Sequence, residues 1–395
     1  MQSVVVLGAG KVGGTIARLL ASTGDYTVRV GDAFEPAVQR MKDEFGIDGQ
    51  VVDASDKAAL VKMLTGADAV LSACSFDVNP TIAEAALDAG ASDFDLTEDV
   101  ACTKKIMATA EHAKADQSVV PQCGLAPGFV SISAHDLSPR FDTLDGVHLR
   151  TGALPMYPNN AMRYNLTWST DGLINEYGNP CEAIVDGKQV HTLPLEGLEH
   201  FTLDGTAFEA FNTSGGVGTL CDTLDGKVRK LDYKTIRYPG HRDLMAFLMQ
   251  ELRMNDRRAM LKDIFESAIP MTEQDEVVVF CVVTGKINGR LTQRTDARVV
   301  THGTFMGVNG TAIQLTTACS ACAVIDMTLH GTLADRTGFV RQEQFTMDAF
   351  LEIRFGRLYR LDHLNSEPDA CRTTSPQRLE TTPANAVPTP APASA

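Results

Sequence analysis

The chain has 395 residues, of which 44% are hydrophobic and 22% charged, so it is long enough for two domains with sizeable cores. Its formal net charge is −15 at pH 7, and it has no dense run of lysine or arginine. This balance argues against nucleic acid and against anionic membrane surfaces as partners. A glycine-rich turn within the first ten residues leaves no room for a secretory signal peptide, and no uninterrupted apolar run approaches the roughly 18 residues of a membrane span.

Nine cysteines are scattered through the sequence. An odd number without an export signal favours reduced thiols and a cytoplasmic location. Cys319 and Cys322 have the spacing of a redox or metal pair, but no second pair and no histidine cluster accompanies them. We therefore expect packed thiols in a helix and no metal site.

The first elements predict a nucleotide-binding turn. Residues 3–7 are a short β-branched run typical of a buried strand, and a helix is expected over 15–20. A second strand over 26–30 leads to Asp32. Glycines with G-x-G-x-x-G spacing join the first strand to the helix, and an acid follows about twenty residues later, which is the dinucleotide-binding fingerprint.

Each glycine of this turn has an expected role. Gly8 permits the sharp turn, Gly10 lets the backbone approach a pyrophosphate, and Gly13 lets helix and strand pack closely. The free N–H groups at the helix start, from Lys11 and Val12 onward, would face the phosphates. Asp32 would bind the adenosine ribose hydroxyls and repel a 2′-phosphate, which favours NAD over NADP. A nucleotide-free turn and an ordinary surface aspartate are the competing interpretations.

Short buried strands continue to alternate with helices up to residue 123. The expected strands are 51–52, 69–73, 94–96 and 118–121. This alternation predicts an α/β fold with a Rossmann-type, doubly wound, mostly parallel sheet over residues 1–123. Residues at the ends of the third and fourth strands are expected beside the cofactor: Asp53 and Ala54 near the adenine, and Ala73 and Cys74.

The periodicity changes after residue 123 and predicts a mixed α+β domain over 124–330. Residues 146–238, including 161–169, are strand-like, while 241–268 and 312–333 are helical; further strands are expected over 277–287 and 298–300. The segment 331–365 is expected to return to the first domain. Residues 366–395 are rich in Pro, Ala, Thr and Ser and are predicted to be disordered.

Seven stretches carry a resemblance to the saccharopine dehydrogenase-like family, closest to its lysine 6-dehydrogenase branch: 4–20, 94–100, 124–130, 164–177, 195–220, 234–241 and 338–345. The resemblance implies that 124–330 is a catalytic and oligomerisation domain, and that the chain forms a homodimer or a higher homo-oligomer. It also implies NAD-dependent oxidation at the ε-carbon of L-lysine, giving 2-aminoadipate 6-semialdehyde, which cyclises to a piperideine carboxylate, and ammonia. Thr170 stands where that branch is expected to have proline, so the substrate stays open.

The chemistry of such a reaction points to particular side chains. An amine must be neutral when its carbon gives up a hydride, so a nearby group must accept or relay a proton, and carboxylates would stabilise the cationic iminium. Asp95 and Glu98 follow the fifth strand, and His241 lies at a loop–helix junction, so these three are the catalytic candidates. Asp95 or Thr97 as a helix cap, and His241 as a capping or solvated residue, are the alternatives.

Substrate-binding candidates come from several segments. Trp168 is the only tryptophan and could line a methylene chain, while Arg237 fits a bidentate carboxylate grip. The other candidates have polar groups or lie in the turns that should face the nicotinamide: Cys123, Gly128, Tyr164, Asn165, Thr213 and Ser214. A packed thiol at Cys123, a core tryptophan and a surface arginine are the competing interpretations.

Two other functions remain open from the sequence. A saccharopine-type reductase that joins an aldehyde to an amino acid would need several converging basic residues, which Arg163, Arg237 and Arg242 could supply. A non-catalytic NAD(H)-binding sensor would bind the cofactor without substrate-dependent reduction.

Overall fold

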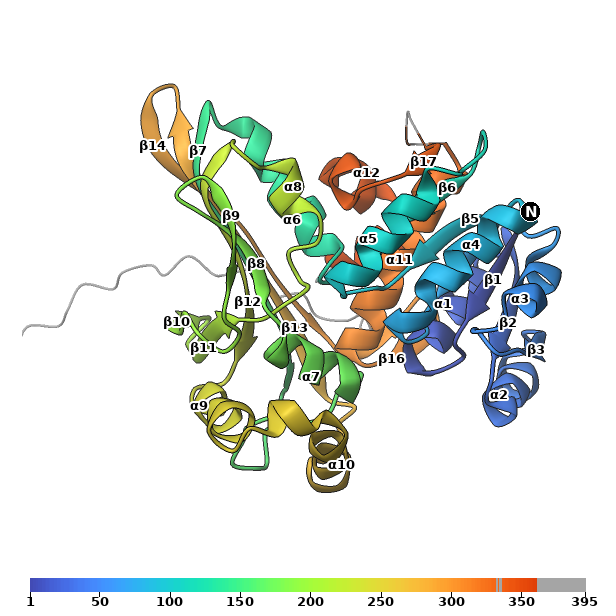
Figure 1. Ribbon diagram of the computed structural model, residues 1–395, viewed down its shortest axis with the longest axis horizontal. Coiled ribbons are helices and arrows are strands. Elements are labelled where there is room, and N and C mark those ends of the chain that lie inside the picture. Colours follow the sequence, from blue (N-terminus) through green and yellow to red (C-terminus); the bar gives the residue numbers. More distant parts are fainter. Residues whose placement is uncertain (332, 334–335, 361–395) are drawn as a thin grey trace, which may run out of the picture.

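The computed structural model describes residues 1–331, 333 and 336–360, and its first sheet is fully parallel with the order β17-β6-β5-β4-β1-β2-β3 (Figure 1). The strands are β1 (Gln2–Leu7), β2 (Tyr26–Asp32), β3 (Gly49–Val51), β4 (Ala69–Ser72), β5 (Ser92–Asp95), β6 (Ser118–Val120) and β17 (Gly338–Phe339). The connecting helices are α1 (Lys11–Ser22), α2 (Glu35–Phe45), α3 (Lys57–Leu64), α4 (Asn79–Ala89) and α5 (Val100–Ala110). This confirms the predicted Rossmann-type sheet.

The second sheet is mixed and has eight strands, in the order β10-β11-β12-β7-β13-β14, with the β8–β9 hairpin paired to β12. Only β7 and β12 are parallel neighbours. The strands are β7 (Thr143–Pro155), β8 (Cys181–Val185), β9 (Lys188–Thr192), β10 (Glu199–Leu203), β11 (Thr206–Asn212), β12 (Val228–Arg237), β13 (Asp275–Ile287) and β14 (Arg290–Thr301). A separate two-stranded sheet pairs β15 (Gly303–Phe305) with β16 (Val308–Gly310).

Helix α11 (Ala312–Leu329) lies between the two sheets and packs against α1 and β13 (Figure 1). By length and composition it could cross a membrane, but 78% of it is buried within the protein. Val6 of β1, Val279 of β13 and Val324 of α11 belong to the same hydrophobic cluster. α11 is therefore the core helix that joins the two halves. Its residues Cys319 and Cys322 are buried in the hydrophobic core.

The region 161–178 differs from the prediction. Residues 161–169, expected as strand, are irregular, and 170–178 form the helix α7 (Thr170–Gly178). Ser169 caps α7, because its hydroxyl oxygen accepts the N–H of Gly172 at 3.2 Å. The apolar alternation in 161–169 resembles a strand, but the Ser169 cap begins a helix directly after it.

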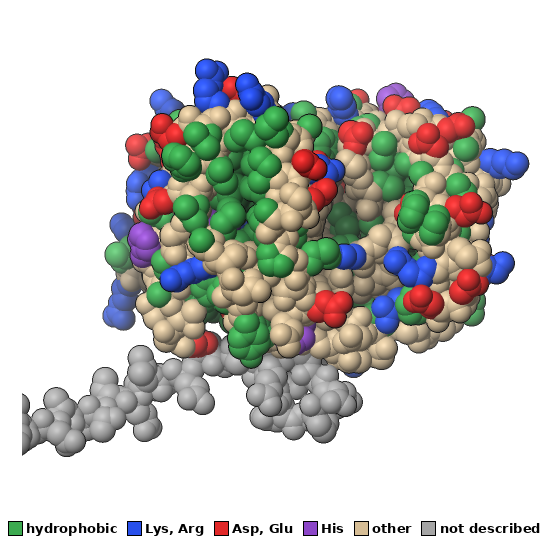
Figure 2. All heavy atoms as spheres, turned by 90° about the horizontal axis from the view of Figure 1, so that it is seen from below, with side chains coloured by type: hydrophobic (Ala, Val, Ile, Leu, Met, Phe, Trp, Pro, Cys, Tyr) green, Lys and Arg blue, Asp and Glu red, His purple; other side chains and the backbone are tan. Residues whose placement is uncertain are grey.

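The predicted helix over 241–268 is interrupted. It consists of α9 (His241–Ala246), a π-helical turn (Phe247–Glu251), a 3₁₀ turn (Met254–Arg257) and α10 (Arg258–Ala268). Arg253 breaks it, since its φ of 55° is left-handed. Seen from below, apolar side chains gather on the half of the molecule that carries α9 and α10, and a hollow separates this half from the other (Figure 2). The large side chains exposed on this interrupted helix are Leu244, Phe247, Leu252, Met260 and Ile264.

The chain returns to the first sheet near its C-terminal end. Gly338 and Phe339 of β17 pair in parallel with Ser118 and Val119 of β6. The remaining helices of the second half are α6 (Phe129–Leu137), α8 (Leu220–Thr223) and α12 (Met347–Glu352). Tyr359 stacks on Phe129 of α6 with ring centroids 3.8 Å apart, which fixes the last described turn. The tail predicted to be disordered, 366–395, lies outside the described residues.

Candidate active site

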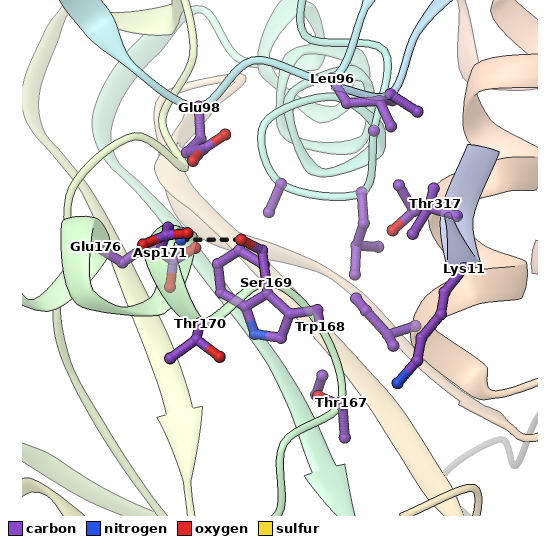
Figure 3. A pocket seen from close by; sticks show the side chains of 18 of the residues that line it. Lys11, Leu96, Glu98, Thr167, Trp168, Ser169, Thr170, Asp171, Glu176 and Thr317 are labelled. Carbon is purple, nitrogen blue, oxygen red and sulfur yellow. Dashed lines mark hydrogen bonds between the residues drawn. The ribbon is translucent and has the colours of Figure 1, made fainter. Parts of the chain in front are cut away.

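A cleft of about 740 Å³ lies between the two halves, and both contribute to its lining. The first half supplies the glycine turn and the loops after β4, β5 and β6, and the second supplies the inner face of β7 and β12 together with 166–172 and α7. Glu98 enters from the loop after β5, Glu176 comes from α7, and Trp168 lies between these acids and Lys11 (Figure 3). The carboxyl ends of the parallel strands meet at this cleft, as expected for a nucleotide-binding sheet.

The glycine turn has the geometry of a phosphate cradle. Gly8 has a φ of 89°, and a Cβ on Gly13 would lie 1.8 Å from the Gly8 carbonyl oxygen, so the fold itself requires both glycines. A Cβ on Gly10 would meet nothing within 4 Å. Gly10 caps α1 without a side chain, so the first N–H groups of the helix face the cleft uncapped. The cradle therefore fits a pyrophosphate through backbone donors.

Asp32 holds the glycine turn in place. Its Oδ2 accepts the Ala9 N–H at 2.6 Å, and its Oδ1 accepts the Phe34 N–H at 2.8 Å. Arg40 donates from Nη2 to the Ala9 carbonyl at 2.8 Å, so both polar groups of Ala9 are fixed. A carboxylate has about four acceptor positions, so two of them remain on Asp32. Asp32 does not belong to the cleft lining, and its contact with ribose hydroxyls stays a prediction.

The other predicted cofactor residues divide into two groups. Lys11, Val12, Ala73 and Cys74 line the cleft. Asp53 and Ala54 lie outside its lining, at the far end of β3. The Asp53 carboxylate accepts the N–H and the hydroxyl of Ser55 at 2.9 and 2.7 Å. These two bonds stabilise the turn after β3 and require no ligand. Their contact with an adenine stays a prediction.

Two carboxyl groups enter the cleft from opposite halves. Burial, together with the neighbouring carboxylates Asp99 and Asp95, raises the pKa of Glu98 to about 7. Burial raises the pKa of Glu176 to about 8, against the lowering effect of Arg237. Both groups therefore change protonation near neutral pH, which suits proton transfer.

Arg237 lies on β12 at the buried wall of the cleft, held by a chain of hydrogen bonds. Its Nε donates to the Tyr177 hydroxyl oxygen at 2.8 Å, and the Tyr177 hydroxyl donates to Nε2 of His241 over 3.1 Å. Nδ1 of His241 donates to the Met162 carbonyl at 2.9 Å. Burial and the charge of Arg237 lower the pKa of His241 to about 3, so the imidazole is neutral.

These hydrogen bonds correct the role predicted for His241. The residue is fully buried behind Tyr177 and does not belong to the cleft lining, so it cannot reach a substrate amine. It positions Tyr177, which in turn positions the guanidinium. Arg237 itself lines the cleft and is buried. The alternative interpretation of Arg237 as an ordinary surface arginine is therefore wrong.

Four predicted substrate residues support the lining from behind. The Tyr164 ring lies under the Arg237 guanidinium, with 5.0 Å between centroid and Cζ. The Thr213 and Thr235 hydroxyls are 2.8 Å apart, and the Ser214 N–H donates to the Glu176 carbonyl at 2.9 Å. All four residues, including Asn165, are buried outside the cleft lining. The structure therefore does not support direct substrate contact by Tyr164, Asn165, Thr213 or Ser214.

Asp95, Cys123 and Gly128 are also structural. Asp95 is buried, and its Oδ1 accepts the N–H groups of Thr97 and Gln122 at 2.8 and 2.9 Å, so it shapes the loop that carries Glu98. The Cys123 thiol donates to the Val120 carbonyl at 2.9 Å, and burial raises its pKa. A Cβ on Gly128 would lie 2.0 Å from the Gly124 oxygen, so the packing of the loop itself requires this glycine, which does not belong to the cleft lining.

The polar lining residues of the second half that the prediction missed include Thr151, Glu176 and Thr235. Glu176 lies in the stretch 164–177 that carries the family resemblance. A capping serine at 169 followed by Asp171 was the sequence signal for a helix, and that helix directs Glu176 into the cleft. Thr151 and Thr235 are register partners on β7 and β12. Nothing in the local sequence distinguishes them from other strand threonines.

Both halves of the chain match domains of a known protein family. Residues 4–120 match the saccharopine dehydrogenase NADP binding domain, and residues 124–358 match the saccharopine dehydrogenase C-terminal domain. The yeast (Saccharomyces cerevisiae) saccharopine dehydrogenase [NADP(+), L-glutamate-forming] is 25% identical over 233 residues, 53% of this chain and 49% of that protein. Rat (Rattus norvegicus) mitochondrial alpha-aminoadipic semialdehyde synthase is 21% identical over 197 residues, 48% of this chain. The match covers about half of the yeast protein and 21% of the rat protein.

Two solved structures share the fold over nearly the whole chain. Apo saccharopine dehydrogenase (L-Glu forming) from Saccharomyces cerevisiae has a TM-score of 0.71 at 16% identity and covers 95% of this chain and 99% of its own. The Legionella pneumophila homospermidine synthase, solved in complex with NAD, has a TM-score of 0.60 at 14% identity and covers 98% and 94%. At these identities the likeness extends to the fold alone.

Proposed function

Because the chain belongs to the saccharopine dehydrogenase family, we propose that it is an NAD-dependent dehydrogenase that removes the ε-amine of L-lysine by oxidation. The products would be 2-aminoadipate 6-semialdehyde, which cyclises to a piperideine carboxylate, and ammonia. The family assignment supports a pyridine nucleotide as the cofactor, and the cleft supports an amine as the substrate.

The charge of the cleft carries this proposal. Its lining has four acidic residues, Glu98, Asp171, Glu176 and Glu266, and two basic ones, Lys11 and Arg237. Asp171 is already paired with Lys262 at 2.5 Å, which leaves three acidic residues for a substrate. Lys11 lies at the start of α1 beside the phosphate cradle, which leaves Arg237 as the basic group at the far wall. One carboxylate and at least one ammonium on the substrate would match this pattern.

The same count argues against the saccharopine-type reductase. A substrate that joins two amino acids carries more carboxylates than one buried arginine can balance. Arg163 and Arg242 do not line the cleft: Arg163 is exposed outside it, and Arg242 pairs with Asp243 at 3.2 Å. Such a substrate was expected to need two or three converging basic residues, and of the three candidate arginines only Arg237 belongs to the described lining.

The residues divide the chemical work. A bound NAD would supply the hydride acceptor, and water would then hydrolyse the iminium to the aldehyde and ammonia. Glu98 enters the cleft from the cofactor half, and a carboxyl with a pKa of about 7 can take the proton that the substrate ammonium must lose. Glu98 is then protonated, so Glu176, when ionised, is the carboxylate that can stabilise the positive charge of the iminium. Trp168 presents an apolar face along which methylene groups can pack.

Asp32 supports NAD over NADP. A 2′-phosphate on the adenosine would lie close to its carboxylate, and the two anions would repel each other. The domain description that matches residues 4–120 names NADP, as does the yeast relative, so the charge of Asp32 is the specific reason for proposing NAD here.

Purified full-length protein tests the proposal when it is mixed with L-lysine and either NAD or NADP. We expect NADH absorbance to appear with NAD and lysine, and to fall at least about a hundredfold in Glu98→Gln, because general-base catalysis contributes at least that factor. The exposed Glu111→Gln is the matched control and should leave the rate unchanged. Reduction of a glutamate and aldehyde mixture by NADPH, without lysine oxidation, would instead establish the reductase.

A further inference from the structure

We propose that the loop 213–218, between β11 and α8, is a positioning element of the cleft, because it holds Glu98 of the first half in place relative to Glu176 of the second. This inference rests on the proposed function, in which Glu98 is the base, and goes beyond it by assigning what places the base. The loop does not belong to the described cleft lining. Its residues therefore act through the two acids and not on a substrate.

Gly215 brings this loop against the backbone of Glu98. A Cβ on Gly215 would lie 2.5 Å from the Glu98 carbonyl oxygen and 3.2 Å from the Glu98 Cβ. Gly215 also has a φ of 86°, a left-handed conformation that glycine adopts without strain. The second half therefore packs directly on the segment that carries the base, and only a glycine permits this approach.

The preceding residue joins the same loop to the second acid. The Ser214 N–H donates to the Glu176 carbonyl at 2.9 Å, and the Ser214 hydroxyl donates to the Asn175 carbonyl at 3.1 Å. The Glu176 carbonyl is one of the last four of α7, which have no N–H partner within the helix. Ser214 and Gly215 thus connect the backbones of two acids that come from opposite halves of the protein.

The loop is itself anchored to the wall of the cleft. The Thr213 hydroxyl lies 2.8 Å from the Thr235 hydroxyl on β12. A Cβ on Gly216 would lie 2.3 Å from the Tyr233 ring, so this ring of β12 packs directly on the loop backbone. Thr235 and Tyr233 both line the cleft. The position of Glu98 is therefore set by the sheet of the second half as well as by its own loop.

The separation of the two acids matters because their charges interact. Burial and the nearby charge of Glu98 raise the pKa of Glu176, and Arg237 opposes them. The other titratable groups near Glu98 are Asp99, Asp95 and the Cys102 thiol. An element that sets the burial of Glu98 and its distance from Glu176 also sets the pH at which the cleft accepts a proton.

Gly215→Ala in the full-length protein tests the inference. The new methyl must push the Glu98 segment and the loop apart, which exposes the carboxyl to water and lowers its pKa towards the ordinary value. We expect the acid limb of the kcat/KM profile for lysine to move down by about one pH unit, a shift typical of carboxyl groups in different protein environments. We expect kcat to fall about a hundredfold, because a displacement of about 1 Å can cost that factor.

A second measurement needs no turnover. Carbon NMR of protein that contains isotope-labelled glutamate follows the Glu98 carboxyl directly, and the signal is assigned by its loss in Glu98→Gln. Its titration midpoint should lie near pH 7 in the wild type and lower in Gly215→Ala. A merely structural glycine would change the melting temperature and leave this midpoint where it is.

Gly205→Ala is the matched control. Gly205 lies in the turn between β10 and β11 with a φ of 80°, and a Cβ there would meet nothing within 4 Å. It introduces the same left-handed strain without a collision, so it should lower the melting temperature and leave the Glu98 midpoint and the pH profile unchanged. Ser214→Ala is a milder variant that removes only the hydroxyl bond to the Asn175 carbonyl, and it should lower the Glu98 midpoint by less.

The outcomes separate this inference from the proposed function. An unchanged Glu98 midpoint in Gly215→Ala, or in Ser214→Ala if the first variant does not fold, would overturn the positioning role even if lysine is oxidised. A lowered midpoint without any oxidation of lysine would uphold the positioning role, and the proposed function would then be the part that fails.

Discussion

Replacing Gly10 by alanine should separate cofactor binding from folding. The new methyl group would meet nothing within 4 Å, and the φ of −72° at this position is ordinary for alanine. We therefore expect a loss of stability of at most about 1 kcal/mol, the cost of alanine at a helix N-cap. The methyl would occupy the space through which a pyrophosphate must approach the start of α1.

The expected loss of affinity follows from the contact distances. A phosphate oxygen held by the N–H groups of Lys11 and Val12 would lie about 2.9 Å from those nitrogens. Carbon atoms in contact need about 3.5 Å or more, so the phosphate must retreat or give up a hydrogen bond. A hydrogen bond to a charged group contributes about 1.5–3 kcal/mol, which corresponds to roughly ten- to a hundredfold in the dissociation constant.

Titration with NADH, followed by quenching of Trp168 fluorescence, measures this change, and thermal unfolding measures stability. Gly14→Ala is the control, because its Cβ would lie 3.4 Å from Met41 Sδ and the residue does not line the cleft. Gly13→Ala should fail differently, by unfolding, since its Cβ would collide with the Gly8 oxygen. An unchanged NADH affinity in Gly10→Ala would refute the phosphate cradle.

Three further changes test other parts of the site. Asp32→Ser should raise the NADPH affinity relative to that for NADH about tenfold or more, because it removes the charge that repels a 2′-phosphate; comparative titrations check this. Tyr177→Phe should raise the KM for lysine more than it lowers kcat, because Arg237 and His241 lose the hydroxyl that joins them; steady-state kinetics would contradict this if kcat alone fell. Glu176 has a pKa of about 8 in the folded protein and binds its proton more tightly there than in the unfolded chain, so wild-type stability should fall as pH rises from about 5 to 8. Glu176→Gln should reduce that fall in denaturant unfolding measured across this range, and an identical pH dependence would contradict the assignment.

The first half of the fold was predictable because its signals are local. The valine run before Gly8, the glycine spacing and the acid at the end of β2 each require only a few neighbouring residues, and all three have the expected geometry. Burial of β1 and the packing of α1 follow from the same pattern.

The substrate half was less predictable because its site is assembled across distant segments. Arg237, Trp168 and Glu98 were recognised by chemical type, and the structure brings all three to one cleft. His241 has the same chemical type as a catalytic base, and only its burial behind Tyr177 shows that it is not one. Thr151 became visible only through the register of β7 against β12.

The late return of the chain to the first sheet has a consequence for any attempt to divide the protein. β17 satisfies the outer edge of β6, since Gly338 donates to the Gln117 carbonyl and Val340 donates to the Val119 carbonyl, both at 2.9 Å. A fragment ending at residue 123 would expose that edge and the apolar surface that α11 covers, and exposed edges of this kind invite aggregation. A soluble nucleotide-binding fragment would have to carry 336–345 and α11 grafted behind β6, because the polypeptide completes this half only after it has built the other.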